Sequence, residues 1–378
     1  MDFSLNDIQQ MLQDSASRFV RNDYGFASRR AIVESAAGYS AAHWQTYAEL
    51  GWLALPFPEE VGGMGGSLSD LMVLQTELGR GLIVEPYLAT VVMAGNLINR
   101  HAAAGQKQAL LEALISGEQL FSFAGFEAAA QHDIRLISTT AGADGDGYRL
   151  NGHKAVVIGA GLGGKLVVVA RTGGRPGDAG GLSLFLLDED AEGVSLQGYT
   201  TNDGLRAADV RLSDVLVGPE ALLGDAGTAA PAINAMLNDA IVALSAEAVG
   251  VMETLLSRTV EFCKVRKQFG VPIGSFQVLQ HRMADMFMEC EQARSMLYYA
   301  TIAVAGGCDA DVAASRLKVR IGKAARLVGQ QAIQLHGGMG VTDELDVGHY
   351  FKRLTMINTQ LGSRDAHLHR LVQLQSVA

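Results

Sequence analysis

Apolar residues recur at helical spacing in the first part of the chain. In LNDIQQMLQDSASRFV (5–20) they return every three or four residues, which is typical of a helix with one buried face. The segment SLSDLMVLQTELGRG (67–81) begins with serines that can cap a helix and ends at a glycine. These patterns predict an N-terminal helical domain over residues 1–117.

The hydrophobic period changes to two from residue 118 to residue 228. Short runs rich in β-branched residues alternate there with turn signals such as Asn151-Gly152, as in YRLNGHKAVVI (148–158) and KLVVVART (165–172). This alternation predicts a compact β domain over 118–228.

Long segments rich in Ala, Leu and Met follow the β region, at 232–263, 276–305 and 310–335. Each is longer than an average globular helix, which is typical of a helical bundle. We therefore predict a C-terminal helical domain over 229–378, and the fold class is α+β in the order α, β, α.

One stretch, AVVIGAGLGGKLVVVA (155–170), contains the letter pattern of a dinucleotide-binding loop. The pattern Gly159-x-Gly161-x-x-Gly164 binds a pyrophosphate only where a strand leads in and a helix begins at the glycines. Here a β-branched run follows the glycines, and no helical period comes next. We predict a hairpin of two strands rather than a Rossmann phosphate loop.

Composition and charge exclude several classes of protein. The chain has 378 residues, a formal net charge of −10 and 19% charged residues, and its Lys and Arg residues form no cluster with interleaved aromatics, so we expect no nucleic-acid partner. The start MDFSLNDIQQ lacks a basic segment followed by an apolar one, and no apolar run reaches the ~20 residues of a membrane span. We therefore expect a cytoplasmic protein without a membrane partner.

Thiol and metal chemistry are sparse in the sequence. The chain contains three cysteines, Cys263, Cys290 and Cys308. Their odd number and the lack of CxxC spacing predict reduced, mostly buried thiols. His367-x-His369 beside Asp365 lacks the partners of a recognised metal motif, so we expect a solvated helix face there and predict no metal site.

Two C-terminal stretches are more specific than any of these patterns. RKQFGVPIGSFQVLQHRMADM (266–286) and QAIQLHGGMGVTDELDVGHYFKR (331–353) closely resemble the flavin-dependent acyl-CoA dehydrogenase family. The segments GWLALPFPEEVGGMGGS (51–67) and LNGHKAVVIGAG (150–161) sit where that family has related segments, so the resemblance covers almost the whole chain.

This resemblance implies a fold and a reaction. The fold has an N-terminal helical domain, a central β-barrel-like domain and a C-terminal four-helix bundle, with FAD between the last two. The reaction, typical of fatty acid metabolism, is α,β-dehydrogenation of an acyl-CoA: a carboxylate base removes the α-proton while a hydride passes from the β-carbon to the flavin. Subunits of the family associate as tetramers built from dimers, which implies a homodimer or homotetramer, or a heterotetramer with a second subunit.

Residues of the matching motifs have suitable chemistry for the ADP half of FAD. Arg266 offers a permanent cation for pyrophosphate oxygens and Phe269 an aromatic surface, while glycines let the backbone approach a ligand. In the family, the matching residues belong to the neighbouring subunit of the dimer. The cofactor-binding residues that the resemblance implies are Arg266, Phe269, Gln277, Gln334, Gly337, Gly338, Val157, Ile158 and Ser363.

The sequence departs from the family at both positions that supply the catalytic base. The Glu that precedes Gly-Thr near the C-terminus in many members is here Leu361, followed by Gly362 and Ser363. The second position, on the first long helix of the C-terminal domain, falls at Ala240, and the Arg that usually follows falls at Ile241. Neither Leu nor Ala can accept a proton.

Several residues that contact the flavin ring in the family are also replaced in this sequence. The family's Thr-Glu-Pro and Gly-Ser-Asp become FEAAAQHD (126–133), which keeps Glu127 and Asp133 but has Gln131 at one of the other positions. The Trp-Ile-Thr segment that packs on the ring becomes Val156-Val157-Ile158. The residues that serve a neighbour's FAD are thus kept, whereas those for the chain's own flavin and substrate are mostly lost.

Three functions follow from this pattern. The chain resembles the support subunit of a heteromeric enzyme, of the small-subunit type of pimeloyl-CoA-type dehydrogenases. A second hypothesis is a self-sufficient homo-oligomer in which Asp239 or Glu247 is a displaced base. On an ideal helix, Glu247 lies about 10 Å along the axis from Ala240, whereas Asp239 is next to Ala240 but rotated from it by about 100° around the axis. A third is a flavin-free association scaffold, since fold alone does not fix function.

Overall fold

The computed structural model describes residues 4–130 and 132–376. Gln131, at the expected flavin contacts, lies outside the described residues. The chain divides into two compact units. One comprises the residues up to Ala31, Ser67–Ile83 and Ile241 to the C-terminal end, and the other comprises Ile32–Gly66 and Val84–Ala240.

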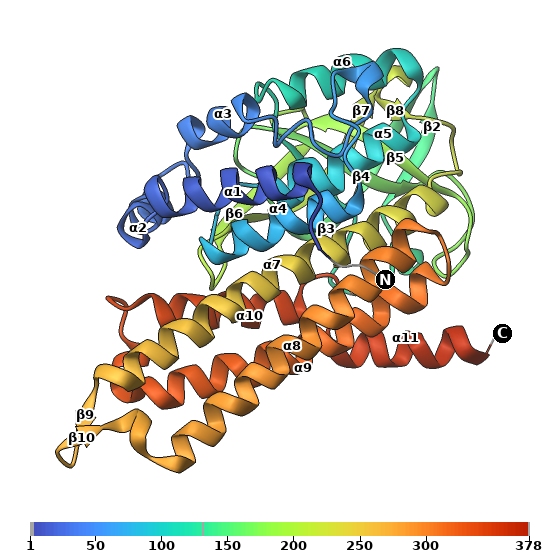
Figure 1. Ribbon diagram of the computed structural model, residues 1–378. Coiled ribbons are helices and arrows are strands. Elements are labelled where there is room, and N and C mark those ends of the chain that lie inside the picture. The colour runs from blue at the N-terminus through green and yellow to red at the C-terminus, as the bar shows by residue number, and fades with distance from the viewer. Residues whose placement is uncertain (1–3, 131, 377–378) are drawn as a thin grey trace. The chain divides into compact units, whose positions relative to one another are not determined.

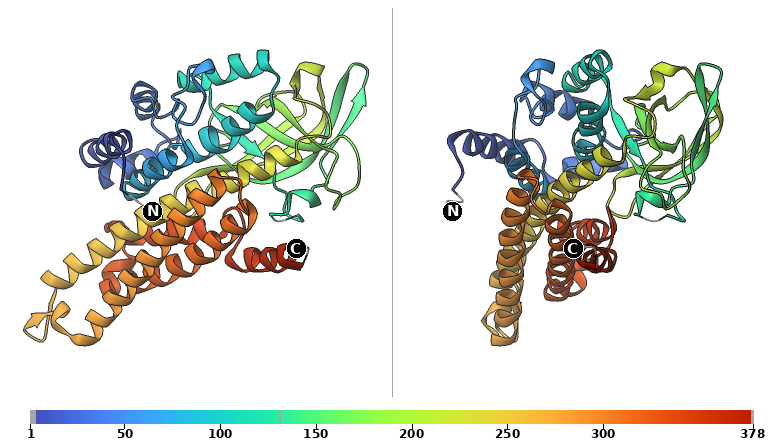
Figure 2. Two further views of the ribbon diagram at one scale, coloured as in Figure 1. Left: turned by 45° about the vertical axis from the view of Figure 1, so that its right-hand side comes forward. Right: turned by 90° about the vertical axis from the view of Figure 1, so that its right-hand side faces the viewer.

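The first unit is a bundle of helices (Figure 1 and Figure 2). Its elements are α1 (Asp7–Asn22), the first part of α2 (Phe26–Glu34), α4 (Leu68–Arg80), most of α7 (Ala230–Val265), α8 (Gln277–Ala305), α9 (Ala310–His336), η6 (Gly337–Val341), α10 (Asp346–Thr359) and α11 (Arg364–Ser376). Helix α9 packs against α8, α10 and α11. The long helices predicted at 232–263, 276–305 and 310–335 are confirmed.

Sequence signals set the ends of the shorter helices. Ser67 and Asp70 form a capping box at the start of α4, in which each side chain accepts a hydrogen bond from the other's backbone N–H. Asn6 and Gln9 form the same arrangement at the start of α1. Helix α4 then stops at Gly81, so the helices predicted at 5–20 and 67–81 are confirmed.

Two glycines bring α4 and α7 into close contact. A Cβ atom on Gly79 would lie 2.2 Å from the carbonyl oxygen of Glu247, and one on Gly250 would lie 2.0 Å from that of Thr76. Residues with a side chain cannot approach so closely, so the crossing depends on glycine at both positions. Helix α4, far away in the sequence, is thereby packed against the C-terminal helices.

The second unit is built on one mixed sheet. The strand order is β6-β7-β3-β2-β4-β5-β8, and β1 pairs in parallel with β4. The strands are β1 (Phe121–Ala124), β2 (Thr140–Asp144), β3 (Gly147–Ile158), β4 (Lys165–Arg171), β5 (Leu182–Asp188), β6 (Val194–Thr200), β7 (Arg206–Val217) and β8 (Leu222–Leu223). The unit also contains α3 (Ala41–Glu49), η1 (Glu59–Val61), η2 (Leu88–Gly95), α5 (Asn96–His101), α6 (Ala104–Ile115), η3 (Ile134–Leu136) and η4 (Pro219–Ala221).

Alternate side chains of the strands form the core of this unit. Leu150, Val168, Phe185 and Val210 come from four strands and are all fully buried. Burial alternates along part of β7, whereas β1, β4 and β5 are buried along almost their whole length. The period of two predicted for 118–228 therefore holds only for part of the sheet.

The predicted hairpin within 155–170 is wrong, although both of its strands exist. Strand β3 pairs with β2 and β7, whereas β4 pairs with β1, β2 and β5. The glycine turn between them is not a phosphate loop. Gly161 and Gly163 have φ values of +87° and +83°, and their N–H groups donate to the carboxylate of Glu189 at 2.9 and 3.1 Å. The anion that this backbone binds is therefore a side chain of the protein itself.

Helix α7 is long and apolar enough to span a membrane by length and composition. In its most apolar window, however, 78% of the residues are buried inside the protein. This burial is typical of a core helix.

Candidate functional site

The connection between α7 and α8 forms an exposed hairpin at one end of the helical unit (Figure 1). Strands β9 (Lys267–Gln268) and β10 (Val271–Pro272) pair across the turn and lead into the short helix η5 (Ile273–Ser275). At the turn, Phe269 is 91% exposed and has a φ of +53°. A large aromatic residue rarely adopts this conformation or this exposure, and such strain clusters at binding sites.

Arg266 lies at the base of this hairpin. Its N–H donates to the carbonyl of Phe262, and its own carbonyl accepts from Ile273, both at 2.8 Å. The side chain is exposed, and within the described residues its guanidinium group forms no ion pair. A fixed backbone that carries a free guanidinium suits an anionic ligand such as a pyrophosphate.

The C-terminal end of α9 supplies the next group of predicted residues. Gln334 and the pair Gly337-Gly338 are exposed there. Gly337 has φ +60° and ψ −141°, a conformation that favours glycine, and its N–H donates to the carbonyl of Gln334. Gln277, also exposed, is the first residue of α8.

The ends of α7 and α9 meet through an aromatic contact. The rings of Phe262 and His336 are stacked with centroids 4.3 Å apart and an interplanar angle of 30°. His336 immediately precedes Gly337, and Arg266 is one turn beyond Phe262. The structure therefore joins the two sequence segments that carry most of the predicted residues.

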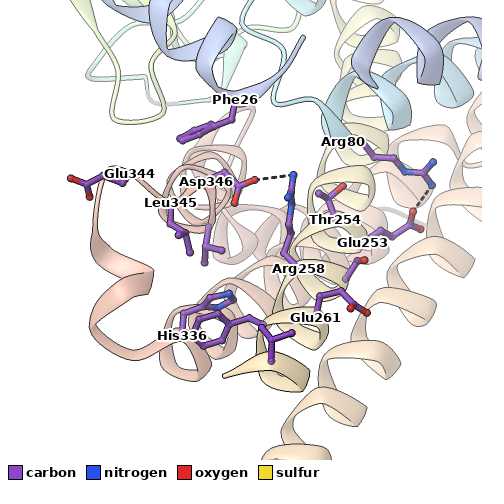
Figure 3. Close-up of a pocket in the computed structure, with 14 residues that line it drawn as sticks. Phe26, Arg80, Glu253, Thr254, Arg258, Glu261, His336, Glu344, Leu345 and Asp346 are labelled. Carbon is purple, nitrogen blue, oxygen red and sulfur yellow. Dashed lines mark hydrogen bonds and ion pairs between the residues drawn. The ribbon is translucent and has the colours of Figure 1, made fainter. Parts of the chain in front are cut away.

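A cavity of about 880 Å³ lies beside this contact (Figure 3). Its walls are apolar around Phe262 and Leu345 and carry ion pairs elsewhere. Arg258 lies 3.1 Å from Asp346 and Arg80 lies 2.6 Å from Glu253, so both guanidinium groups are already paired. Burial lowers the pKa of His336, which keeps its ring neutral near pH 7.

The turn after α10 holds the position that the resemblance gives to the base. Leu361 is 7% exposed with a φ of +57°, and its carbonyl accepts a hydrogen bond from His367 Nε2 at 2.9 Å. His367 also contacts the Ser315 hydroxyl at 3.2 Å. Lys318 donates to the carbonyl of Ile357 at 2.5 Å, and burial lowers the pKa of this lysine to about 7.

This geometry corrects one prediction about the C-terminal histidines. His367 is 4% exposed and holds the turn from within the unit, so the predicted solvated face is wrong for this residue. His369 is exposed, as predicted. Cys263 and Cys290 are buried free thiols and Cys308 is an exposed one, which confirms mostly buried, unpaired cysteines.

Ser363 lies beside a second, smaller cavity of about 310 Å³. Its hydroxyl accepts from the N–H of Ala366 and caps α11. Arg326 and Arg364 line the cavity, and within the part of the chain that the structure describes neither forms an ion pair. With Lys323 and Asp365 also in the lining, the net charge of the cavity wall is positive.

The two proposed displaced bases are both engaged with arginines. Asp239 lies 2.6 Å from Arg100 and accepts a second hydrogen bond from Asn96 at 2.9 Å. Glu247 is buried and accepts two hydrogen bonds from Arg353, at 2.5 and 2.7 Å. Either carboxylate would have to leave its arginine to act as a base.

Strand β3 presents its predicted flavin contacts unequally. Val157 is 2% exposed and belongs to the core of the sheet, whereas Ile158 is half-buried. Val156 is 51% exposed with a φ of +53°, which is a rare conformation for a β-branched residue. The register of β3 with β7 shifts between Lys154 and Val157. This bulge turns Val156, which is absent from the predicted cofactor-binding residues, toward the surface.

A buried ion pair fixes β3 to the segment that precedes it. Lys154 Nζ lies 2.9 Å from Glu127, whose carboxylate also accepts from the N–H and hydroxyl groups of Ser138 and Thr139. Lys154 is fully buried and Glu127 is 6% exposed. A buried lysine is rare unless it is paired, but sequence alone does not show that Lys154 is buried.

Comparison with known proteins decides what the chain is related to. The models of the N-terminal, middle and C-terminal domains of acyl-CoA dehydrogenases match residues 6–118, 122–215 and 230–373. This chain belongs to the acyl-CoA dehydrogenase family. The three-domain fold that the sequence predicts is confirmed; its boundaries at 117/118 and 228/229 stay a prediction.

Individual relatives agree with this assignment. The acyl-CoA dehydrogenase IpdE2 of Mycobacterium tuberculosis is 32% identical over 348 residues, which cover 91% of this chain and 90% of that protein. The solved structure of a variant of the Tcur3481-Tcur3483 steroid ACAD has a TM-score of 0.88 at 32% identity and covers 99% of both chains. The FAD complex of PigA has a TM-score of 0.90 at 26% identity and covers 100% of this chain and 99% of that one.

Members of this acyl-CoA dehydrogenase family are FAD-dependent oxidoreductases that act on CH–CH bonds. The described residues fit the ADP half of FAD. Arg266 offers a free guanidinium group and Phe269 an exposed aromatic ring just after α7, and the exposed pair Gly337-Gly338, here called the glycine corner, follows the end of α9. They fit the flavin ring less well, because the exposed residue of the β3 bulge is a valine without an aromatic face or a hydroxyl.

Proposed function

We propose that this chain is the support subunit of a heterotetrameric acyl-CoA dehydrogenase in the cytoplasm. In this role it lends its exposed hairpin and the glycine corner of α9 to the ADP half of an FAD whose flavin ring a catalytic partner holds. The FAD supplies the hydride acceptor, and the partner supplies the base for the acyl-CoA substrate. The residues lent to the partner are Arg266, Phe269, Gln277, Gln334, Gly337 and Gly338.

The observation that carries this proposal is the turn after α10. Removal of the weakly acidic α-proton of a thioester requires a base within hydrogen-bond reach. At the position where the resemblance places that base, the turn carries the hydrocarbon side chain of Leu361, 7% exposed. The second position carries Ala240, which is fully buried. The support role requires no carboxylate at either position.

Two further observations support a partner of the same family. The steroid ACAD to which this chain is similar carries two protein names, Tcur3481 and Tcur3483. Asp239 and Glu247 are held by Arg100 and Arg353, so the support role leaves both ion pairs intact. The self-sufficient homo-oligomer and the flavin-free scaffold are the other outcomes of the test below.

Flavin content and reduction test the proposal directly. The absorbance at 450 nm is measured on the chain purified alone and on the chain co-expressed with a second acyl-CoA dehydrogenase subunit from the same source, before and after addition of short-chain, long-chain and steroid side-chain acyl-CoA thioesters. We expect little flavin in the lone chain, and about one FAD per two chains in the complex, bleached by one of the thioesters. Near-stoichiometric flavin that bleaches in the lone chain would overturn the support role.

Substitutions assign the outcome to residues. In the complex, Arg266→Ala is expected to lower FAD content, whereas the matched change Lys264→Ala, at an exposed lysine paired with Glu261, is expected to leave it unchanged. If the lone chain is reduced by substrate, Asp239→Asn and Glu247→Gln identify the displaced base. A complex that binds no FAD at all would favour the scaffold.

A further inference from the structure

The stacked pair Phe262 and His336 lies between the two halves of the surface assigned above to the ADP half of FAD. His336 is the last residue of α9 and is 5% exposed, and Phe262 lies in the last turn of α7. The rings are 4.3 Å apart and nearly parallel. Figure 3 shows His336 at the wall of the large cavity, below Arg258 and Asp346.

Each member of the pair is directly connected to a residue of that surface, Phe262 by a backbone hydrogen bond to Arg266 and His336 by its peptide bond to Gly337. The carbonyl of Phe262 accepts the N–H of Arg266 at 2.8 Å. His336 Nδ1 lies 2.8 Å from the carbonyl of Ala332, which can only accept, so Nδ1 carries the proton. That bond orients the ring on its own helix, and the next residue, Gly337, donates to the carbonyl of Gln334.

The cavity makes the stack important for spacing. Phe262, Val265 and His336 all line the space of about 880 Å³, so on one side the rings border a cavity. Where partner atoms are missing, dispersion contacts are lost, and the remaining contact carries more of the attraction. The charged groups that line the cavity with His336 are Arg80 on α4, Glu253, Arg258 and Glu261 on α7, Glu344 before α10 and Asp346 at its start.

We propose that His336 is a positioning residue: its stack on Phe262 sets the spacing between Arg266 and the Gly337-Gly338 corner that the ADP half of FAD requires. The inference rests on the proposed function, because it concerns the same surface. His336 itself affects the cofactor only through this spacing.

The test measures FAD affinity in the co-purified complex after removal of the flavin, by titration with FAD and flavin fluorescence. His336→Ala removes the ring and is expected to weaken FAD binding about tenfold, as loss of a stacked aromatic pair predicts. His336→Phe keeps a ring for stacking and is expected to restore the affinity to within about threefold of the wild type. Equal weakening by both variants would overturn the inference.

Two controls separate positioning from stability and from the function itself. Leu297→Ala, a buried large-to-small change on α8 (1% exposed), is expected to lower the melting temperature but not the FAD affinity. If His336→Ala weakens FAD binding no more than Leu297→Ala while Arg266→Ala weakens it strongly, the positioning role is overturned and the support function stands. If Arg266→Ala leaves the affinity unchanged, the proposed function itself fails.

Discussion

Replacing Glu127 with Gln tests how the sheet unit depends on a buried charge. The Glu127 carboxylate accepts five hydrogen bonds, from Ser138, Thr139 and Lys154. Burial alone would raise the pKa of Glu127, but Lys154 and these hydrogen bonds lower it to about 2. Burial lowers the pKa of Lys154 to about 8, so its ammonium is still charged at neutral pH. Apart from Glu127, it contacts the carbonyl of Gly125 at 3.3 Å.

The expected change in the free energy of unfolding follows from the loss of the charge partner of the Lys154 ammonium group in Glu127→Gln. With its counter-charge gone, the buried lysine releases its proton, and the penalty at pH 7 is bounded by the deprotonation of a lysine of ordinary pKa, about 5 kcal/mol. We expect a loss of about 3–5 kcal/mol in the free energy of unfolding, as for other broken buried pairs. Lys154→Met should cost less, about 1–3 kcal/mol, because Glu127 keeps four of its five donors.

Urea unfolding between pH 6 and pH 8 measures both the cost and its origin. In the variant, the native state holds Lys154 neutral while the unfolded state binds a proton, so the cost of Glu127→Gln falls as the pH rises, by up to about 1.4 kcal/mol per pH unit. Lys165→Met, which breaks a surface pair with Asp188, is the control and should cost less than ~1 kcal/mol. A cost below about 1 kcal/mol for Glu127→Gln, or one that does not change with pH, would refute the reasoning.

Three other changes test features of the helical unit. Gly250→Ala places a Cβ atom 2.0 Å from the Thr76 carbonyl and should cost about 1–3 kcal/mol in chemical unfolding, whereas Gly105→Ala, with open space around it, should be neutral or stabilising. Gly362 has a φ of +100°, and the Cβ atom that Gly362→Ala adds would lie 2.8 Å from His367 Nε2. This change should cost about 1–3 kcal/mol in the free energy of unfolding and so lower the melting temperature, and an unchanged melting temperature would contradict the role of that turn. Because burial lowers the pKa of Lys318 to about 7, the unfolded state binds one more proton above that pH; wild-type stability should therefore rise with pH above 7, and Lys318→Met should remove that part of the rise.

The sequence predicts the helices well because their signals are local. The capping boxes at Asn6 and Ser67 and the glycine at 81 fix where helices begin and end, and each signal spans only a few residues. Strand pairing depends on partners far away in the chain. The run at 155–170 reads as a hairpin because two strands flank a glycine turn, yet β3 pairs with β7, about 50 residues later.

In the candidate site, too, local sequence patterns identify individual residues but not the contacts between distant segments. The motif residues around Arg266 and Gly337 are exposed and close to one contact, Phe262 with His336, that no local pattern reveals. On β3, a bulge exposes Val156 and buries Val157, and no local pattern in the sequence marks that bulge. The sequence predicts a solvated His367, but tertiary packing buries it beneath the Leu361 turn.

The glycine crossing of α4 and α7 has a consequence for synthesis on the ribosome. Gly79 on α4 leaves the ribosome about 170 residues before Gly250, the glycine on α7 that packs against α4. At about 5–20 residues per second, this interval lasts roughly 10–30 s. During that time the face of α4 that carries Thr76 and Gly79 has no α7 to cover it. We therefore expect chaperones that bind nascent helices to raise the yield of folded chain in a foreign host, because α4 cannot complete its packing until the C-terminal half has emerged.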